Sequence, residues 1–259
     1  MQQKRVGITA RTLRLLNYFC TLSYDRYIIL VICQQTVYIL HMQTLPSEKK
    51  LKEIWAEVPP DYYFKLNFLQ NLWHEWKWLV IKYLVSKNGK APKTILEVGC
   101  NAGHLSGLLH TIFPKAKITG IDVYDEPIIE AKKRYRGITF KIADAHTLPF
   151  ADRSFDLVVC SETIEHVVDP GKVLHEISRV LNKNGEALVE MDSGSLLFRV
   201  IWWGWTTFGK GIVWKNAHLH PFTARELEGL IRSNGFTIDQ KTFSHFGMAV
   251  SFLVSNKNN

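Results

Sequence analysis

The sequence has only four cysteines, and their placement matches no cysteine-based site. Cys20, Cys33, Cys100 and Cys160 form no CxxC pair, and the cysteines and histidines do not show the paired spacing that zinc requires. The sequence therefore predicts neither a disulfide framework nor a zinc site. Unpaired cysteines of this kind fit a reducing compartment best, so we expect a cytoplasmic protein.

The sequence also lacks an apolar run of the roughly 20 residues that a membrane span needs. The nearest candidate is the pair of runs 27–33 and 37–40, which two glutamines separate. A basic start before an apolar stretch leaves a signal anchor open, although no small-residue cleavage site follows. We favour the hypothesis that residues 1–41 lie outside the working protein, because Met42 opens a stretch of ordinary globular character. N-terminal sequencing of the native protein would test it.

A dense basic stripe is missing too, despite a formal net charge of +8. Half of the excess lies before His41, which leaves the rest of the chain only mildly basic. Binding dominated by phosphates needs clustered Lys and Arg rather than a dispersed surplus. This composition makes nucleic acid an improbable partner.

What is present is an alternation of short β-branched runs with helical stretches, which predicts a parallel sheet covered on both faces. Apolar residues recur at threes and fours over 60–86, which indicates an amphipathic helix. We therefore divide the chain into an extension (1–41), a helical cap (42–92) and an α/β domain (93–259). The expected strands lie near 94–98, 117–122, 139–142, 156–160, 187–191, 237–242 and 249–254, and the expected helices near 102–112, 127–135, 170–181 and from Thr223.

The first strand of this domain runs into a tight glycine turn and then a helix, over Ile95-Leu-Glu-Val-Gly-Cys-Asn-Ala-Gly-His-Leu-Ser106. Gly99 and Gly103 allow the backbone to approach a ligand closely. The dinucleotide fingerprint fails, because its second and third glycines are replaced by Asn101 and His104, and no Gly-Lys-Ser/Thr follows for a phosphate-binding loop.

Later motifs follow this turn in order. Gly120-Ile-Asp122 ends the second strand about 20 residues on, where a Rossmann-like site places a carboxylate for the ribose hydroxyls. We therefore predict that Asp122 binds ribose. The later motifs are Ala143-Asp-Ala145, Leu148-Pro-Phe150, Ser154-Phe-Asp-Leu-Val-Val-Cys160 and Glu162-Thr-Ile-Glu-His-Val167.

These motifs resemble the class I S-adenosylmethionine-dependent methyltransferases, in particular the family with the type 11 methyltransferase domain, over residues 94–191. The resemblance implies a Rossmann-like fold with a seven-stranded, mostly parallel sheet, a C-terminal antiparallel strand and S-adenosyl-L-methionine as cofactor. Asn101 stands where the family often has glycine, but asparagine tolerates left-handed backbone. The cofactor-binding residues that the resemblance implies are Glu97, Gly99, Cys100, Asn101, Gly103, Asp122, Val123, Asp144, Ala145 and Ser161.

Several of these side chains have a purely structural alternative. Asp144 and Asp156 could be turn formers or helix caps, and for Asp156 we favour this role. Ser161 and Glu162 follow the fourth strand, where the reactive methyl group is expected, but the same position suits a polar residue that closes a strand.

A hydroxyl acceptor needs its proton removed, and histidine is the usual base near neutral pH. The candidates are His166, His218 and His220, and we select His166, Glu162 and His220 as the catalytic group. A hydrogen-bonded structural role is at least as common for each histidine.

Glu162, Glu165 and His166 have the spacing i, i+3 and i+4, so a helical turn would place them on one face, within reach of His218 or His220. This resembles quinone-precursor and small-RNA methyltransferases that hold Mg²⁺ with an ExxEH element and a distant histidine. A Glu-His pair after the fourth strand is also common in type 11 enzymes that need no metal. We therefore predict no metal ligands and keep a bound ion as the less favoured hypothesis.

All eight tryptophans lie outside the predicted nucleotide-binding core, and four of them fall in or beside an aromatic-rich insertion at 194–216. Its apolar stretch at 196–214 suits an interfacial helix or a lid over an apolar substrate, with peripheral membrane contact. It equally suits a cap buried against the helix before the core. Both alternatives are compatible with a small, lipophilic acceptor.

We therefore expect an enzyme (EC 2.1.1.-) that methylates such an acceptor at oxygen or carbon. An RNA methyltransferase is the second hypothesis, but the sequence has no Asn/Asp-Pro-Pro-Tyr/Phe motif and no added RNA-binding module. A non-catalytic cofactor-binding subunit is the third, and the intact glycine turn and Asp122 speak against it. The sequence does not predict the oligomeric state.

Overall fold

The computed structural model describes residues 28–33, 36–41, 67–89, 91–209, 211 and 218–257. They fall into two compact units, Met1–Ser47 and Glu48–Asn259. The division falls after Ser47, six residues beyond the boundary expected from the sequence. In the first unit, β1 (Ile28–Cys33) and β2 (Thr36–His41) pair as an antiparallel ladder in which Ile28 lies opposite His41. The two apolar runs of the N-terminal segment are therefore strands of one hairpin.

The second unit is built on a seven-stranded sheet with the order β5-β4-β3-β6-β7-β9-β8. Strands β3 to β7 pair in parallel, and β9 is antiparallel to both of its neighbours. This confirms the predicted Rossmann-like sheet with one antiparallel strand near the C-terminus. The strands are β3 (Thr94–Val98), β4 (Lys117–Asp122), β5 (Thr139–Ile142), β6 (Phe155–Ser161), β7 (Leu181–Asp192), β8 (Phe236–Ser244) and β9 (Ala249–Asn256).

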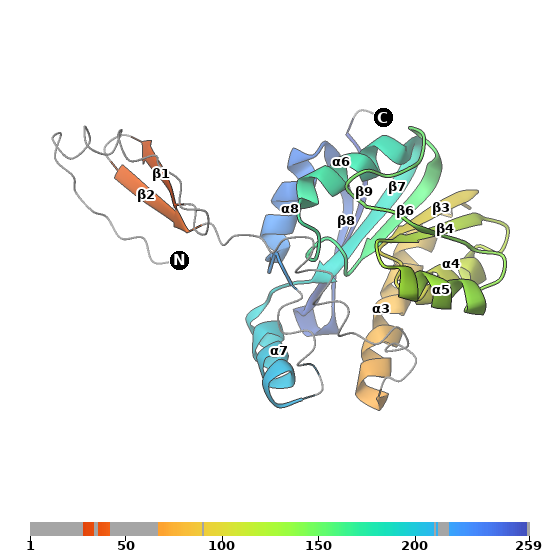
Figure 1. Cartoon of the computed structure of the whole chain (residues 1–259), viewed down its shortest axis with the longest axis horizontal. Helices are drawn as coiled ribbons and strands as arrows, with labels where there is room; N and C mark the ends of the chain where they lie inside the picture. The colour runs from red at the N-terminus through yellow and green to blue at the C-terminus, as the bar shows by residue number, and fades with distance from the viewer. Residues whose placement is uncertain are drawn as a thin grey trace. The chain divides into compact units, whose positions relative to one another are not determined.

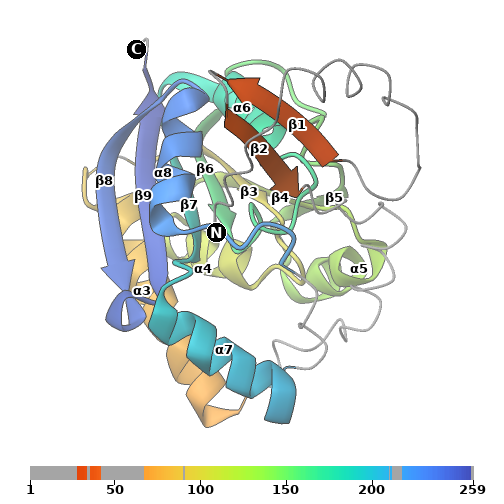
Figure 2. The ribbon, with the colours of Figure 1, turned by 90° about the vertical axis from the view of Figure 1, so that its left-hand side faces the viewer.

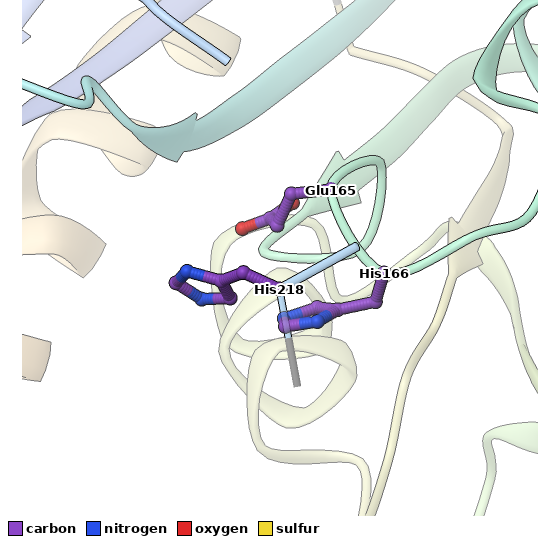
Figure 3. Close-up of side chains that lie close together, drawn as sticks. All are labelled: Glu165, His166 and His218. Carbon is purple, nitrogen blue, oxygen red and sulfur yellow. The ribbon is translucent and has the colours of Figure 1, made fainter. Parts of the chain in front are cut away.

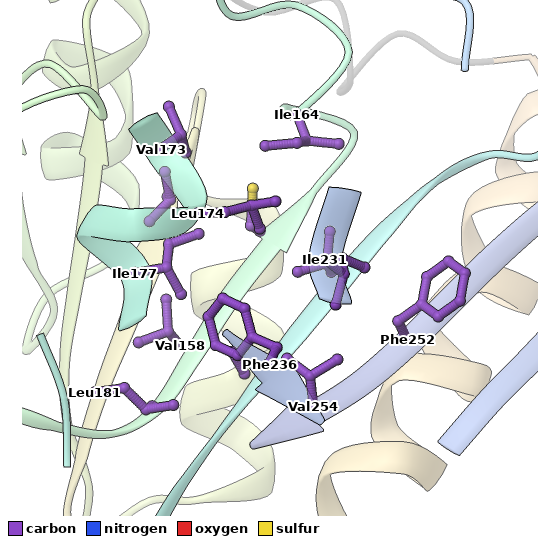
Figure 4. Close-up of a cluster of buried hydrophobic side chains, with 14 of the residues drawn as sticks. Val158, Ile164, Val173, Leu174, Ile177, Leu181, Ile231, Phe236, Phe252 and Val254 are labelled. Atoms are coloured by element: carbon purple, nitrogen blue, oxygen red, sulfur yellow. The ribbon is translucent and has the colours of Figure 1, made fainter. Parts of the chain in front are cut away.

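Helices cover both faces of this sheet (Figures 1 and 2). Alternate residues of the central strand β6 point to opposite faces, so Val158 packs with α6 and α8 while Val159 packs with α3 and α4. Figure 4 shows the first of these two cores. The helices are α3 (Phe68–Ser86), α4 (His104–Ile112), α5 (Asp125–Arg134), α6 (Pro170–Val180), α7 (Leu196–Phe208) and α8 (Ala224–Ser233), with a short 3-10 turn η3 (His245–Gly247).

Capping residues explain where the helices begin. Asn67 and Gln70 form a reciprocal capping box with both bonds at 3.0 Å, which starts α3 at Phe68. The remainder of the expected helix, 60–66, lies outside the described residues. Gly103 is left-handed (φ 81°), which starts α4 at His104 rather than at Ala102. Thr223 and Glu226 form the predicted capping box of α8.

Among the described residues, no helix combines the length and the apolar character that crossing a bilayer requires.

Candidate active site

The candidate site lies at the carboxyl ends of the parallel strands. The chain passes from β3 to β4 on one side and later returns to β6 on the other side of β3. Ligands of open α/β sheets bind in the crevice at such a change of direction. The loops after β3, β4, β6 and β7 carry most of the residues that the sequence selects.

Backbone hydrogen bonds hold the glycine turn against β4. The amides of Gly99 and Cys100 both donate to the carbonyl of Ile121, at 2.9 and 2.8 Å. Asn101 has φ 46° in the left-handed region, so the residue that departs from the family pattern takes a conformation that asparagine tolerates. A Cβ atom at Gly99 would lie 2.1 Å from Thr163 Oγ1, so this glycine also lets the loop after β6 approach.

Asp122 ends β4 and holds the glycine turn with its side chain. Its Oδ2 accepts a hydrogen bond from the Asn101 amide at 2.8 Å, and its Oδ1 accepts one from the Tyr124 amide at 3.1 Å. Burial raises the pKa of Asp122, and these backbone bonds oppose the rise. Each carboxylate oxygen can accept a further hydrogen bond. The carboxylate therefore has acceptor capacity left for a ligand with paired hydroxyls.

Glu97 is buried between β3 and α4, where Ser106 Oγ donates to its carboxyl group. Burial raises the pKa of Glu97 to about 8, although the bond from Ser106 lowers it. The native protein thus keeps a proton on this group at pH values where an unfolded chain, with a pKa of about 4.3, has released it.

Glu97→Gln is expected to weaken the pH dependence of stability. The native state binds more protons between about pH 4.3 and pH 8, so the unfolding free energy falls as pH rises, by up to about 1.4 kcal/mol per unit. A neutral glutamine removes this contribution. Urea unfolding at pH 5.5 and pH 8.5 should show a smaller fall for Glu97→Gln than for wild type. Glu75→Gln, which changes an exposed residue of α3, should behave as wild type; equal falls in all three proteins would contradict the assignment.

The other predicted cofactor residues differ in what their side chains contact. Cys100 packs into a small core with α5, and its Sγ donates to the carbonyl of Asn101 at 3.6 Å. Val123 is exposed beside Asp122, and Ala145 packs against the core around α6. Asp144 Oδ1 accepts bonds from the His146 amide and ring, at 2.8 and 2.7 Å, which matches the turn-forming alternative.

Asp156 is a structural residue, as expected. Its oxygens accept bonds from the amides of Lys93 and Thr94 and from the side chain of Asn182. It lies near the start of β6, away from the strand ends that carry the site.

A buried ion pair lies where β6 ends. Lys77 Nζ, from α3, pairs with the carboxylate of Glu162. Burial would raise the pKa of Glu162, but the Lys77 charge lowers it to about 2. Glu162 is left-handed (φ 48°), and its amide donates to the carbonyl of Glu190 at 2.9 Å. A carboxylate held ionised in this way is a poor base, which weakens the predicted catalytic role of Glu162.

Two further acids come from the end of β7, the buried Glu190 and the half-buried Asp192. Ser161 Oγ donates to Glu190, and burial raises the pKa of Glu190 to about 7 against the effect of the Lys77 charge. Burial also raises the pKa of Asp192, and the Glu162 charge adds to this rise. Lys77 thus lies among three acidic groups.

Glu165, His166 and His218 converge beside this group (Figure 3). One ligand atom from each residue lies within 4.8 Å of the others. The rings of His166 and His218 have centroids 4.9 Å apart, and burial lowers the pKa of His218 to about 3. The predicted partner His220 is bonded elsewhere, through Nε2 to the carbonyl of Val168 at 3.3 Å. The structure therefore selects His218 rather than His220, and Glu165 rather than Glu162, from the suggested cluster.

Sequence reasoning missed Lys77, Glu190 and Asp192. Lys77 falls on the apolar face of its helix, four residues from Trp73 and from Ile81, which is a detectable signal. Glu190 and Asp192 end an apolar strand, where a strand-end site would place polar groups. Their convergence depends on contacts between elements distant in sequence.

The predicted aromatic insertion contains α7, which begins at Leu196. Ser195 caps it, because its side chain accepts a hydrogen bond from the Phe198 amide. Only Phe198 and Thr206 of this helix are buried. Its outer apolar surface, hereafter the α7 face, is exposed, which disfavours the alternative of a buried cap. The α7 face consists of Leu196, Leu197, Val200, Ile201, Trp203 and Phe208.

Comparison with known proteins agrees with this architecture. Residues 96–189 match the family model described as a methyltransferase domain. A "SAM-dependent methyltransferase, possible histamine N-methyltransferase" of Thermotoga maritima superposes with a TM-score of 0.60 at 24% identity, covering 80% of this chain and all of that one. At this identity the likeness concerns the fold alone.

Two curated relatives are more similar in sequence. A ubiquinone/menaquinone biosynthesis C-methyltransferase of Desulfotalea psychrophila is 31% identical over 129 residues, 49% of this chain and 52% of that protein. A malonyl-[acyl-carrier protein] O-methyltransferase of Legionella pneumophila is 37% identical over 98 residues, 37% of this chain and 34% of that protein. The chain spans about half the length, or less, of these two relatives.

The fold and the strand-end site together define a class I methyltransferase architecture. Over residues 96–189 the chain is similar to the type 11 methyltransferase domain that its motifs predicted.

Proposed function

We propose that the chain is an S-adenosylmethionine-dependent methyltransferase that acts on a small, lipophilic acceptor at oxygen or carbon. The observation that carries this proposal is the geometry of Asp122, whose carboxylate both fixes the glycine turn and keeps acceptor capacity at the strand ends. The sulfonium cofactor supplies an activated methyl group. The protein contributes alignment of the acceptor atom with that group, which is worth several kcal/mol.

The roles of the residues follow from their places. Asp122 accepts the ribose hydroxyls, and the turn from Gly99 to Gly103 lies against the rest of the cofactor. Where the acceptor atom is a hydroxyl, His166 removes the proton, because Glu162 is held ionised by Lys77 and the His220 ring is directed to a backbone carbonyl. The remaining predicted contacts, through Val123, Asp144, Ala145 and Ser161, belong to the same proposal.

The lipophilic acceptor is supported by the α7 face and by the relatives. Phe198 and Trp202 of α7 stack near His218, which links this helix to the site, while the α7 face points outward. The names of the two relatives give an acceptor in quinone biosynthesis and a malonyl group on a carrier protein. We propose that the α7 face rests on a membrane surface and that the acceptor enters beneath the helix.

Val200→Glu tests this arrangement, because it puts a carboxylate on the α7 face. We expect transfer of labelled methyl groups to a long-chain quinol in vesicles to fall about 5–30-fold, the equivalent of about 1–2 kcal/mol. Transfer to a short-chain, water-soluble quinol should change less than about twofold. Thr237→Glu, at an exposed position of β8, should change neither reaction.

The outcomes separate the competing functions. Label that appears in tRNA and not in quinols would support the RNA methyltransferase. Cofactor binding without transfer to quinols, acyl carrier protein or tRNA would support the non-catalytic subunit. Equal loss with both quinols would show that α7 does not meet a membrane.

A further inference from the structure

We propose that Glu165, His166 and His218 bind a divalent first-row transition-metal ion such as Zn²⁺. The three side chains come from two segments, the loop after β6 and the chain before α8, and lie close together (Figure 3). Their nearest ligand atoms all lie within 4.8 Å of one another. With the ion bound, His166 would act as a ligand and no longer as the base of the proposed methyl transfer, since a nitrogen that binds the ion cannot accept a proton.

The carboxyl group of Glu165 provides an independent observation. Glu165 is only 3% exposed, and neither of its carboxyl oxygens has a hydrogen-bond partner among the described residues. Leaving a buried polar group without a hydrogen-bond partner lowers stability by about 1 kcal/mol up to several kcal/mol. Native proteins therefore rarely keep such a group. An ion bound between this carboxyl group and two imidazoles would satisfy it.

Backbone hydrogen bonds hold the two segments side by side. The amides of Leu219 and His220 both donate to the carbonyl of Glu165, each at 3.0 Å. These bonds place His218 beside the Glu165 side chain. The amide of His166 donates to the carbonyl of Thr163 at 3.0 Å, which closes the turn that carries both residues.

An aromatic contact also fixes the ring of His218. The ring lies nearly parallel to that of Trp202, with centroids 4.5 Å apart and planes at 15°. A ligand whose orientation is fixed in this way loses less freedom on binding an ion. Trp202 belongs to α7, so the ion would connect this helix to the strand ends.

The donor set decides which ion fits. Two imidazoles and one carboxylate suit zinc, iron or another first-row transition ion, whereas Mg²⁺ prefers oxygen ligands and water. The ligand atoms around a tetrahedral zinc ion lie about 3.4 Å from one another. The ligand atoms of these three residues would therefore need to move closer to one another by at most about 1.5 Å. Glu162, a ligand in the Mg²⁺ hypothesis, is instead paired with Lys77.

Three protein ligands leave one position open, as in catalytic zinc sites. An acceptor oxygen bound there would lose its proton more easily, because the ion stabilises the resulting oxyanion. This last step rests on the proposed function.

The test uses the full chain, purified without a polyhistidine tag and stripped with a chelator that is then dialysed away. Calorimetric titration with ZnCl₂ should give one equivalent bound with a Kd below about 1 µM. The visible absorption of bound Co²⁺ should report coordination by nitrogen and oxygen. Glu165→Gln and His218→Ala should each weaken Zn²⁺ binding by about 100-fold or more. His175→Ala, which removes an exposed histidine of α6, should leave binding unchanged.

Circular dichroism and thermal unfolding show whether each variant is folded, and Glu165→Gln keeps the size of the side chain. Absence of Zn²⁺ and Co²⁺ binding by the wild type would overturn the proposal. Binding of unchanged affinity in both folded variants would overturn it too. S-adenosylmethionine is titrated in parallel without metal, so a failure of the proposed function is seen separately.

Discussion

Asp122→Ala is expected to weaken binding of S-adenosylmethionine and S-adenosylhomocysteine by about 100-fold or more. Two hydrogen bonds to a charged carboxylate are worth about 1.5–3 kcal/mol each, and 2.7 kcal/mol corresponds to a factor of 100. The variant also releases the Asn101 amide, so the glycine turn loses the bond that fixes it. Calorimetric titration of both ligands measures the effect.

Asp122→Asn separates these two contributions. Asparagine keeps the size of the side chain and one acceptor oxygen, so it can still hold the Asn101 amide, but it cannot accept from two ribose hydroxyls as a carboxylate does. We expect an intermediate loss of about tenfold. Asp239→Ala, on the exposed surface of β8, is the matched control and should bind as wild type. Wild-type affinity in Asp122→Ala would show that this carboxylate does not meet the cofactor.

Lys77→Met is expected to lower the unfolding free energy by about 3–5 kcal/mol, because it leaves a buried carboxylate without its partner. Lys77 is 3% exposed, and its ammonium group pairs with Glu162. The carboxylates of Glu162 and Glu190 raise the pKa of Lys77 even though burial opposes this, so the charge is present at neutral pH. Methionine keeps the apolar stem and removes only the charge.

The companion variants make this result specific. Lys77→Met combined with Glu162→Gln should lose clearly less stability than Lys77→Met alone, since no ion then stays unpaired. Lys82→Met changes an exposed lysine of the same helix and should stay within about 0.5 kcal/mol of wild type. Urea unfolding at neutral pH measures all three. A loss in Lys77→Met no larger than in Lys82→Met would refute a structural role for the ion pair.

The strands of the second unit could be predicted from sequence because their signals are local. Lys117–Asp122 and Thr139–Ile142 were expected at the bounds that the structure shows. Helix starts were less predictable where apolar periodicity continues beyond the cap. The apolar pattern before Asn67 suggests one long helix, yet the Asn67 side chain caps a helix that begins at the next residue.

The candidate site likewise contains some residues that could be predicted from the sequence and others that could not. Asp122 and the glycine turn follow one strand and one turn, so their positions could be read from spacing. The arrangement of Glu165 and His218 could not, because it depends on backbone bonds between residues more than fifty positions apart. The choice between Glu162 and Glu165 depended on Lys77, whose helix precedes the whole α/β domain.

The contribution of α3 bears on how the chain can be divided experimentally. Ile81, Leu84 and Val85 complete one of the two cores, and Lys77 pairs with Glu162 at the strand ends. A fragment trimmed to residues 96–189 would lose both and expose apolar surface on the sheet. The segment that matches the family model is therefore too short to fold by itself. We expect expression of residues 96–189 alone to give aggregated protein.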